Sequence, residues 1–91
     1  MNDSTHTRTE IVSQVNALMQ KGFEIDSSKL VPTASLFVDL GLDSLDAVDM
    51  LVHLEERFKV KINGEELMQI KTLGDVYGLV ESVMARAPHQ S

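Results

Sequence analysis

The sequence contains no cysteine and no tryptophan, and it has only two prolines among its 91 residues. Without cysteine the chain has neither a disulfide nor a thiolate metal ligand, so its fold depends on packing alone. Positive charge is also scarce, because eight Lys and Arg face fourteen Asp and Glu, which gives a formal net charge of -6. Nucleic acids and anionic membrane surfaces repel such a chain, so basic protein surfaces are its natural partners.

Long apolar runs are missing as well. No segment approaches the length that spans a membrane, and the polar first seven residues do not resemble a secretory signal. We therefore expect a cytoplasmic protein without membrane insertion. A chain this short forms one domain and buries about 60–65% of its unfolded surface, which leaves no room for a deep catalytic cavity. Its three histidines, His6, His53 and His89, are too scattered to predict a metal site.

The first half of the chain is predicted to form one helix followed by a long loop. Apolar residues recur at helical spacing from about Arg8, and Gly22 is expected to end this helix. Residues 22–43 then form a connection whose length is uncommon in compact domains and often functional. We expect its apolar side chains to hold it against the core; they are Phe23, Ile25, Leu30, Val31, Leu36, Phe37 and Leu40.

The second half is predicted to contain two longer helices and a short one. Ser44 should begin a helix that Asp43 caps and that runs to about Phe58. One or two helical turns are expected at 65–70, whereas the Asn-Gly pair before them indicates a turn. The Thr-Leu-Gly-Asp sequence at 72–75 is typical of a capping box and opens the last helix.

Together these elements predict an all-α protein. We expect a small four-helix bundle over residues 8–86, with three longer helices, one short helix and a long ordered loop between the first two helices. Residues 1–7 and 87–91 are predicted to be flexible tails.

The predicted second helix has two apolar sides. At about 100° per residue, Ala47, Met50, Leu51, Leu54 and Phe58 cluster on the side that must face the core. A separate stripe consists of Leu45, Val48 and Val52. Six acids and no Lys or Arg lie from residue 39 to residue 56, namely Asp39, Asp43, Asp46, Asp49, Glu55 and Glu56. An apolar stripe with an acidic rim is typical of a docking surface, but a helix buried on two sides with solvated acids would give the same pattern.

Ser44 lies where the loop ends and this helix begins. Serine often caps a helix, but Asp43 is the better cap here, which leaves the Ser44 hydroxyl free. The amides of the first turn point outward and favour a bound anion. The acids on both sides make Ser44 a poor nucleophile and a suitable target for modification by another enzyme.

The stretch Asp39-Leu40-Gly41-Leu42-Asp43-Ser44-Leu45-Asp46, followed by Val48 and Leu54-Glu55-Glu56-Arg57-Phe58, resembles the acyl carrier proteins. The amphipathic first helix, the long loop, the Leu36-Phe37 pair and the register from Ile62 to Leu73 are similar as well. The resemblance covers about residues 8–86.

This resemblance implies a non-catalytic carrier that is modified at Ser44, with Asp43 and Leu45 beside the site. A phosphopantetheinyl transferase would attach 4'-phosphopantetheine from coenzyme A to this serine, using magnesium. The group ends in a thiol that holds acyl chains as thioesters, so it would supply the thiol that the chain lacks. A monomeric carrier would then deliver acyl intermediates to enzymes of fatty acid, polyketide or related lipid biosynthesis.

The resemblance also implies roles for the second helix, which is the main recognition element of the family. Apolar contact falls to Leu45, Val48 and Val52. Contact with basic patches on acyl-loading and acyl-processing enzymes falls to Asp43, Asp46, Asp49, Glu55 and Glu56. The acyl chain would lie between the helices, lined by Met50, Leu54 and Ile62.

Three positions depart from the pattern of carriers for fatty acid synthesis. Arg57 lies in a run that is often wholly acidic, His53 stands where a small residue is common, and Asn63-Gly64 stands where Pro and an acid are usual. A specialised carrier for one secondary pathway is therefore supported at least as well as a housekeeping one.

Other functions remain open at this point. A peptidyl or aminoacyl carrier would share the fold and the cofactor, although its second helix is usually less acidic, and an unmodified helical interaction module would share the bundle alone. An esterase with a G-D-S-L block is disfavoured, because His53 lies about two and a half helical turns from Ser44 and the G-x-S-x-G elbow is absent.

Overall fold

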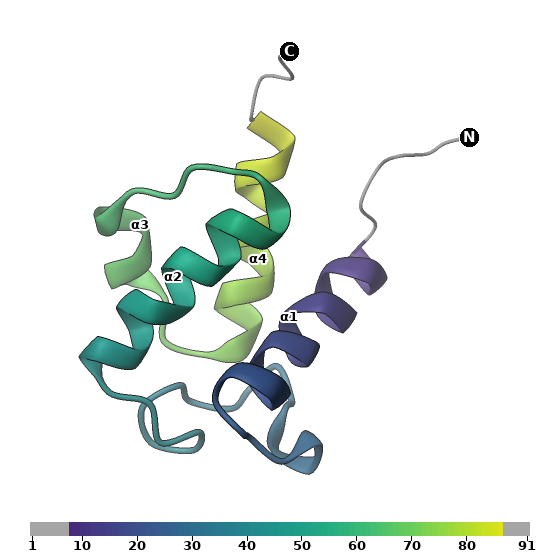
Figure 1. The fold of residues 1–91 in the computed structure, drawn as a ribbon, viewed down its shortest axis with the longest axis vertical. Helices are drawn as coiled ribbons and strands as arrows, with labels where there is room; N and C mark the ends of the chain where they lie inside the picture. Colours follow the sequence, from purple (N-terminus) through teal and green to yellow (C-terminus); the bar gives the residue numbers. More distant parts are fainter. Residues whose placement is uncertain (1–7, 87–91) are drawn as a thin grey trace.

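A computed structural model of the protein describes residues 8–86 as a bundle of helices (Figure 1). Its elements are α1 (Arg8–Gly22), the 3-10 helix η1 (Ser27–Lys29), α2 (Ser44–Phe58), α3 (Gly64–Gln69) and α4 (Leu73–Arg86). Within this range the only β-type pairing is an isolated bridge between Ser35 and Thr72, so the all-α prediction is confirmed. The predicted tails, residues 1–7 and 87–91, lie outside the described residues. No helix in the described part of the chain is long and apolar enough to cross a membrane.

The core lies where α1 and α2 pack against α4. The predicted inner side of α2 faces it, with Met50, Leu54 and Phe58 buried and the remaining two members, Ala47 and Leu51, partly buried. The predicted apolar residues of the last helix face it too, which are Leu73, Val76, Tyr77, Val80 and Val83, with Met84 partly buried.

A polar pair joins α1 to α4 inside this packing. The Tyr77 hydroxyl donates a hydrogen bond to Asn16 Oδ1 at 2.5 Å. Burial raises the pKa of Tyr77, and the bond to Asn16 and the charge of Arg8 oppose that shift. Arg8 lies over the Tyr77 ring, 5.7 Å from its centroid, and pairs with Glu81 at 2.7 Å. The buried phenol is therefore satisfied by α1 rather than left without a partner.

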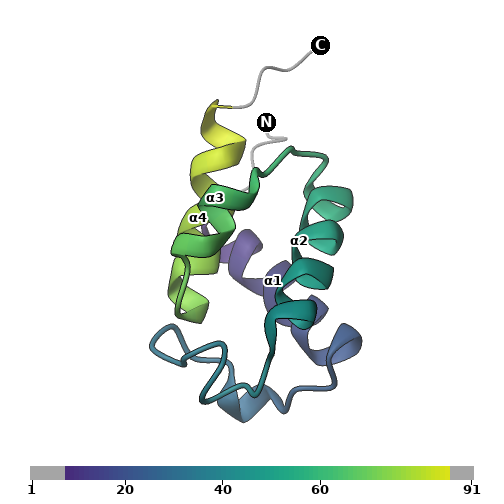
Figure 2. The same cartoon turned by 90° about the vertical axis from the view of Figure 1, so that its left-hand side faces the viewer.

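The loop between α1 and α2 is fixed to the α3–α4 connection by backbone hydrogen bonds. The Leu36 N–H donates to the Lys71 carbonyl at 2.9 Å, and the N–H of Leu73 donates to the Ala34 carbonyl at 2.9 Å. A third bond of 2.8 Å runs from the Gly74 N–H to the Pro32 carbonyl. Figures 1 and 2 show the result, a loop that crosses the end of the bundle at which α2 begins.

The prediction that the apolar loop residues hold the loop to the core is correct for most of them. Ile25, Leu30, Leu36 and Leu40 are buried, and Phe23 packs partly against the core. It is wrong for Val31 and Phe37, whose exposed fractions are 45% and 48%. Each follows a buried leucine directly, and the loop directs the neighbouring side chain away from the core.

The short third helix is confirmed, but its start differs from the prediction. Asn63 does not merely form a turn; its Oδ1 accepts the Glu66 N–H at 3.0 Å, and the Glu66 carboxylate accepts the Asn63 N–H at 3.4 Å. Asn63 is thus the N-cap of α3, with a reciprocal capping box.

Candidate functional site

Ser44 is the first residue of α2 and is exposed. Asp43 is the N-cap, as predicted, and its Oδ1 accepts the Asp46 N–H at 2.9 Å. Asp46 reciprocates, because its Oδ2 accepts the Asp43 N–H at 3.2 Å. The helix start is therefore capped by two aspartates, and the Ser44 hydroxyl is not needed for capping.

The backbone that leads into Ser44 is held from the core side. Leu42 is buried, and its N–H donates to the Leu36 carbonyl at 3.0 Å. Gly41 turns the chain with a φ of +71°, a left-handed conformation that favours glycine. Because Leu36 is itself bonded to Lys71, the position of Ser44 depends on both α2 and the α3–α4 connection.

The second apolar stripe of α2 faces outward. Leu45 is 78% exposed, Val48 52% and Val52 44%. The alternative of a helix buried on two sides is therefore excluded. An exposed apolar stripe of this kind is a feature that a binding partner explains better than the fold does.

The acids around the stripe differ in what their carboxylates already contact. Asp43 and Asp46 cap the helix, and Glu55 Oε2 accepts the Ile62 N–H at 2.8 Å, which ties α2 to the segment before α3. Asp49 Oδ1 lies 3.6 Å from His53 Nε2. Glu56 is exposed and has no polar partner within residues 8–86.

The predicted lining of an acyl chain lies in the core. Met50 and Leu54 are fully buried, and Ile62 is 4% exposed. Residues 8–86 contain no group of His, Asp or Glu placed to hold a metal ion.

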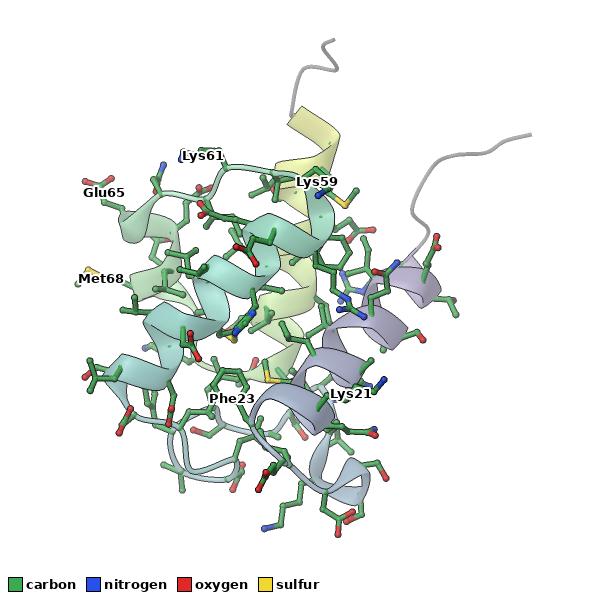
Figure 3. The ribbon with its side chains drawn as sticks, viewed as in Figure 1. Lys21, Phe23, Lys59, Lys61, Glu65 and Met68 are labelled. Carbon is green, nitrogen blue, oxygen red and sulfur yellow. The ribbon has the colours of Figure 1, made fainter. Side chains whose placement is uncertain are left out.

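Basic residues follow the acids at the far end of α2. Figure 3 shows Lys59 and Lys61 on the connection after α2, at the end of the bundle away from Ser44. Lys59 ends the helix in a left-handed conformation, with a φ of 58°. The acids of this surface therefore end at Glu56, and the next charged residues along the chain, Arg57, Lys59 and Lys61, are basic.

Sequence reasoning missed two features of this site. It did not predict that Glu55 would bind a backbone amide seven residues later, and the sequence holds no local signal for that contact. It also assigned Asp46 to docking and to the negative charge around Ser44, but not to the cap of α2. The signal for its capping role was present, since an acid three residues after the cap defines a capping box.

Comparisons with known proteins agree with this geometry. The family described as "Phosphopantetheine attachment site" matches residues 13–80. Acyl carrier protein 2 of Ralstonia nicotianae is 42% identical over 79 residues, covering 87% of this chain and 98% of that protein. The acyl carrier protein of Thermosynechococcus vestitus is 38% identical over 78 residues, which are 86% of this chain and 96% of that protein.

The fold is similar to solved structures as well. The crystal structure of an acyl carrier protein from Thermotoga maritima superimposes with a TM-score of 0.77 at 21% identity, covering 89% of this chain and 94% of that one. An acyl carrier protein from Enterococcus faecalis superimposes with a TM-score of 0.71 at 25% identity, covering 85% and 98%.

Proposed function

Because the chain belongs to the acyl carrier protein family, whose phosphopantetheine attachment domain holds a covalent 4'-phosphopantetheine, we propose that Ser44 is the residue that receives this group. Members of this family are non-catalytic carriers, and this protein is one. The observation that supports Ser44 is its position. The residue is exposed at the first position of α2, and Asp43 and Asp46 cap the helix, so the Ser44 hydroxyl is not needed for capping.

The surroundings of Ser44 fit a bound phosphate ester. The first-turn amides at the start of α2 favour an anion, and the exposed hydroxyl leaves the attached group open to solvent. Asp43 and Asp46 repel the phosphate, so the arm extends outward rather than folding back onto the helix. The attached group supplies a thiol that can hold acyl chains, which this cysteine-free chain otherwise lacks.

The attachment reaction uses Ser44 as its acceptor. The Ser44 Oγ forms a bond to the phosphorus of the phosphopantetheine half of coenzyme A. The pyrophosphate bond breaks, adenosine 3',5'-bisphosphate leaves, and the hydroxyl proton passes to a base of the transferase. No catalytic group of the carrier is required.

The exposed stripe of α2 is the proposed docking surface. Leu45, Val48 and Val52 would enter the interface, while Asp49 and Glu56 would meet basic side chains of the partner and orient it. The partners would be a phosphopantetheinyl transferase and acyl-loading or acyl-processing enzymes of fatty acid, polyketide or related lipid biosynthesis. The carrier would act as a monomer in the cytoplasm.

Intact mass tests the attachment site. Incubation with coenzyme A, magnesium and a broad-specificity phosphopantetheinyl transferase should raise the mass by one phosphopantetheine, and Ser44→Ala should abolish the gain. Ser82→Ala, at an exposed position of α4, is the matched control and should keep it. A gain that survives Ser44→Ala, or no gain in the unaltered protein, would refute the assignment.

A further inference from the structure

Two exposed apolar side chains stand on the loop just before Ser44. Phe37 is 48% exposed and Val38 is 83% exposed. Val38 and Met68 share the highest exposed fraction among the large apolar residues in the described part of the chain. Neither contributes to the core as a buried residue, and neither belongs to α2. Adjacent in the chain and both exposed, the phenylalanine and the valine form a small apolar patch that a binding partner could cover.

The turn that presents this pair is held by its own hydrogen bonds. Asp39 Oδ2 accepts the Ser35 N–H at 2.7 Å, and Ser35 Oγ accepts the Val38 N–H at 3.2 Å. The Ser35 carbonyl accepts the N–H groups of Asp39 and Leu40, both at 3.0 Å. The pair is therefore displayed on an ordered turn, so a partner would not have to order it on binding.

Buried leucines on either side keep the pair facing outward. Leu36 is 1% exposed and Leu40 is 8% exposed, so the core positions of this turn are already filled. The Leu42 N–H, two residues before Ser44, bonds to the Leu36 carbonyl. The turn and Ser44 are therefore joined through one short, anchored segment at the same end of the bundle (Figure 2).

The chemistry of this turn repeats that of α2. Phe37 and Val38 are followed by Asp39 and Asp43, just as the apolar stripe of α2 is bordered by acids. A partner surface that is apolar at its centre and basic at its edge suits both elements. A second copy of this chain does not suit them, because two such faces would bring like charges together, and an anionic membrane is repelled for the same reason.

We propose that Phe37 and Val38 form a second docking element, which enters an apolar recess next to the basic docking patch of an acyl-loading enzyme. The inference rests on the proposed carrier function and deepens it. α2 would hold the carrier along the chain after Ser44, and the Phe37–Val38 turn would hold it along the chain before Ser44, so the attached arm leaves a segment with a contact at each end.

Steady-state loading of the holo-protein tests this proposal. The probe is a purified acyltransferase from the carrier's own host that transfers an acyl group from coenzyme A to the carrier thiol. Val38→Ser and Phe37→Ser should each raise the KM for the carrier about tenfold, because each loses an apolar contact of that size. The kcat at saturating carrier should stay within twofold, since neither residue touches the reacting thioester.

Val31→Ser is the matched control, because Val31 is an exposed apolar residue of the same loop outside this turn. It should leave the KM unchanged, and circular dichroism should show equal helicity in all variants. The proposal is overturned if Val38→Ser and Phe37→Ser load with the KM of the unaltered protein, or if Val31→Ser raises the KM equally. Dimers or vesicle binding that depend on Val38 would also overturn it, because the occupant would then be a second copy or a lipid surface.

Failure of the second docking element can be distinguished from failure of the proposed function, because the KM values test the first and the Ser44→Ala mass tests the second. If Ser44→Ala still gains phosphopantetheine, the attachment site is wrong whatever the turn does. If Ser44 is modified and the KM values are unchanged, only the second docking element is wrong.

Discussion

Asp75 holds together the start of α4 through a single carboxylate oxygen. Its Oδ2 accepts the N–H groups of Lys71 at 2.9 Å and Thr72 at 3.1 Å, while Thr72 Oγ1 accepts the Asp75 N–H at 3.2 Å. This confirms the capping box predicted from the sequence. The backbone bond from Lys71, followed by that from Thr72, lowers the pKa of Asp75 below the ordinary aspartate value. The ionised carboxylate is thus the form that the fold prefers.

The first prediction concerns acid stability. Because the pKa of Asp75 is lower in the folded state, its contribution is fully present above about pH 5 and is lost as pH falls below about 4. An asparagine at this position cannot ionise, so Asp75→Asn should be less stable than the unaltered protein at neutral pH. This difference in the free energy of unfolding should shrink below about pH 4. Urea unfolding from pH 7 to pH 2.5 measures it.

A second aspartate, in the loop between α1 and α2, should behave in the same way. The pKa of Asp26 is also lowered, chiefly by the backbone bond from Ser28. Asp26→Asn should therefore also be less stable than the unaltered protein at neutral pH, and this difference in the free energy of unfolding should shrink over the same pH range. In the double variant the two differences should add. A difference for Asp75→Asn that stays constant across the whole range would contradict the role assigned to this carboxylate.

At the scale of an element, α2 serves both the fold and the proposed docking. Its acids have equal charge but unequal roles: Asp46 completes the capping box, whereas Glu56 has no polar partner in residues 8–86. A charge reversal at Asp46 therefore disturbs the helix as well as the surface. A reversal at Glu56 changes the surface alone, which makes it the cleaner test of docking.

The second prediction follows from this difference. Glu56→Lys should raise the KM for the phosphopantetheinyl transferase several-fold without changing stability, because it acts on the charge of the rim. Asp46→Lys should raise the KM and also lower the free energy of unfolding by about 1 kcal/mol, since a capping bond is lost. Glu65→Lys, an equal change of charge on α3, is the control. Equal KM values for Glu56→Lys and Glu65→Lys would show that only net charge matters.

The same scale shows what the sequence could and could not predict. The helices were predictable because their apolar spacing and their caps, such as Asp43 and Thr72, are local signals. The exposure of Val31 and Phe37 was not, because the direction of a loop side chain depends on the path of the loop backbone, for which an irregular segment offers no periodic signal. Ser44 was predicted as a modification site from its neighbours and from the family resemblance, whereas the Glu55 bond to Ile62 required the folded structure.

At the scale of the whole molecule, the position of Ser44 depends on a contact about thirty residues away. The loop before it is bonded to the α3–α4 connection, and at Gly74 the two backbones approach so closely that a Cβ would lie 3.0 Å from the Pro32 carbonyl oxygen. A backbone oxygen cannot swing aside as a flexible side chain does. Any side chain at residue 74 must therefore push the loop and α4 apart.

Gly74→Ala is the last prediction, and α4 offers its own control. The added methyl should lower the free energy of unfolding by about 1–3 kcal/mol, because it overpacks the contact with Pro32. Gly78→Ala, on the same helix with nothing within 4 Å of its Cβ, should instead raise it by about 0.5–1 kcal/mol. If the anchored loop positions Ser44, Gly74→Ala should also slow phosphopantetheine attachment under conditions in which it remains folded, whereas Gly78→Ala should not. Normal attachment by folded Gly74→Ala would show that α2 alone positions the serine.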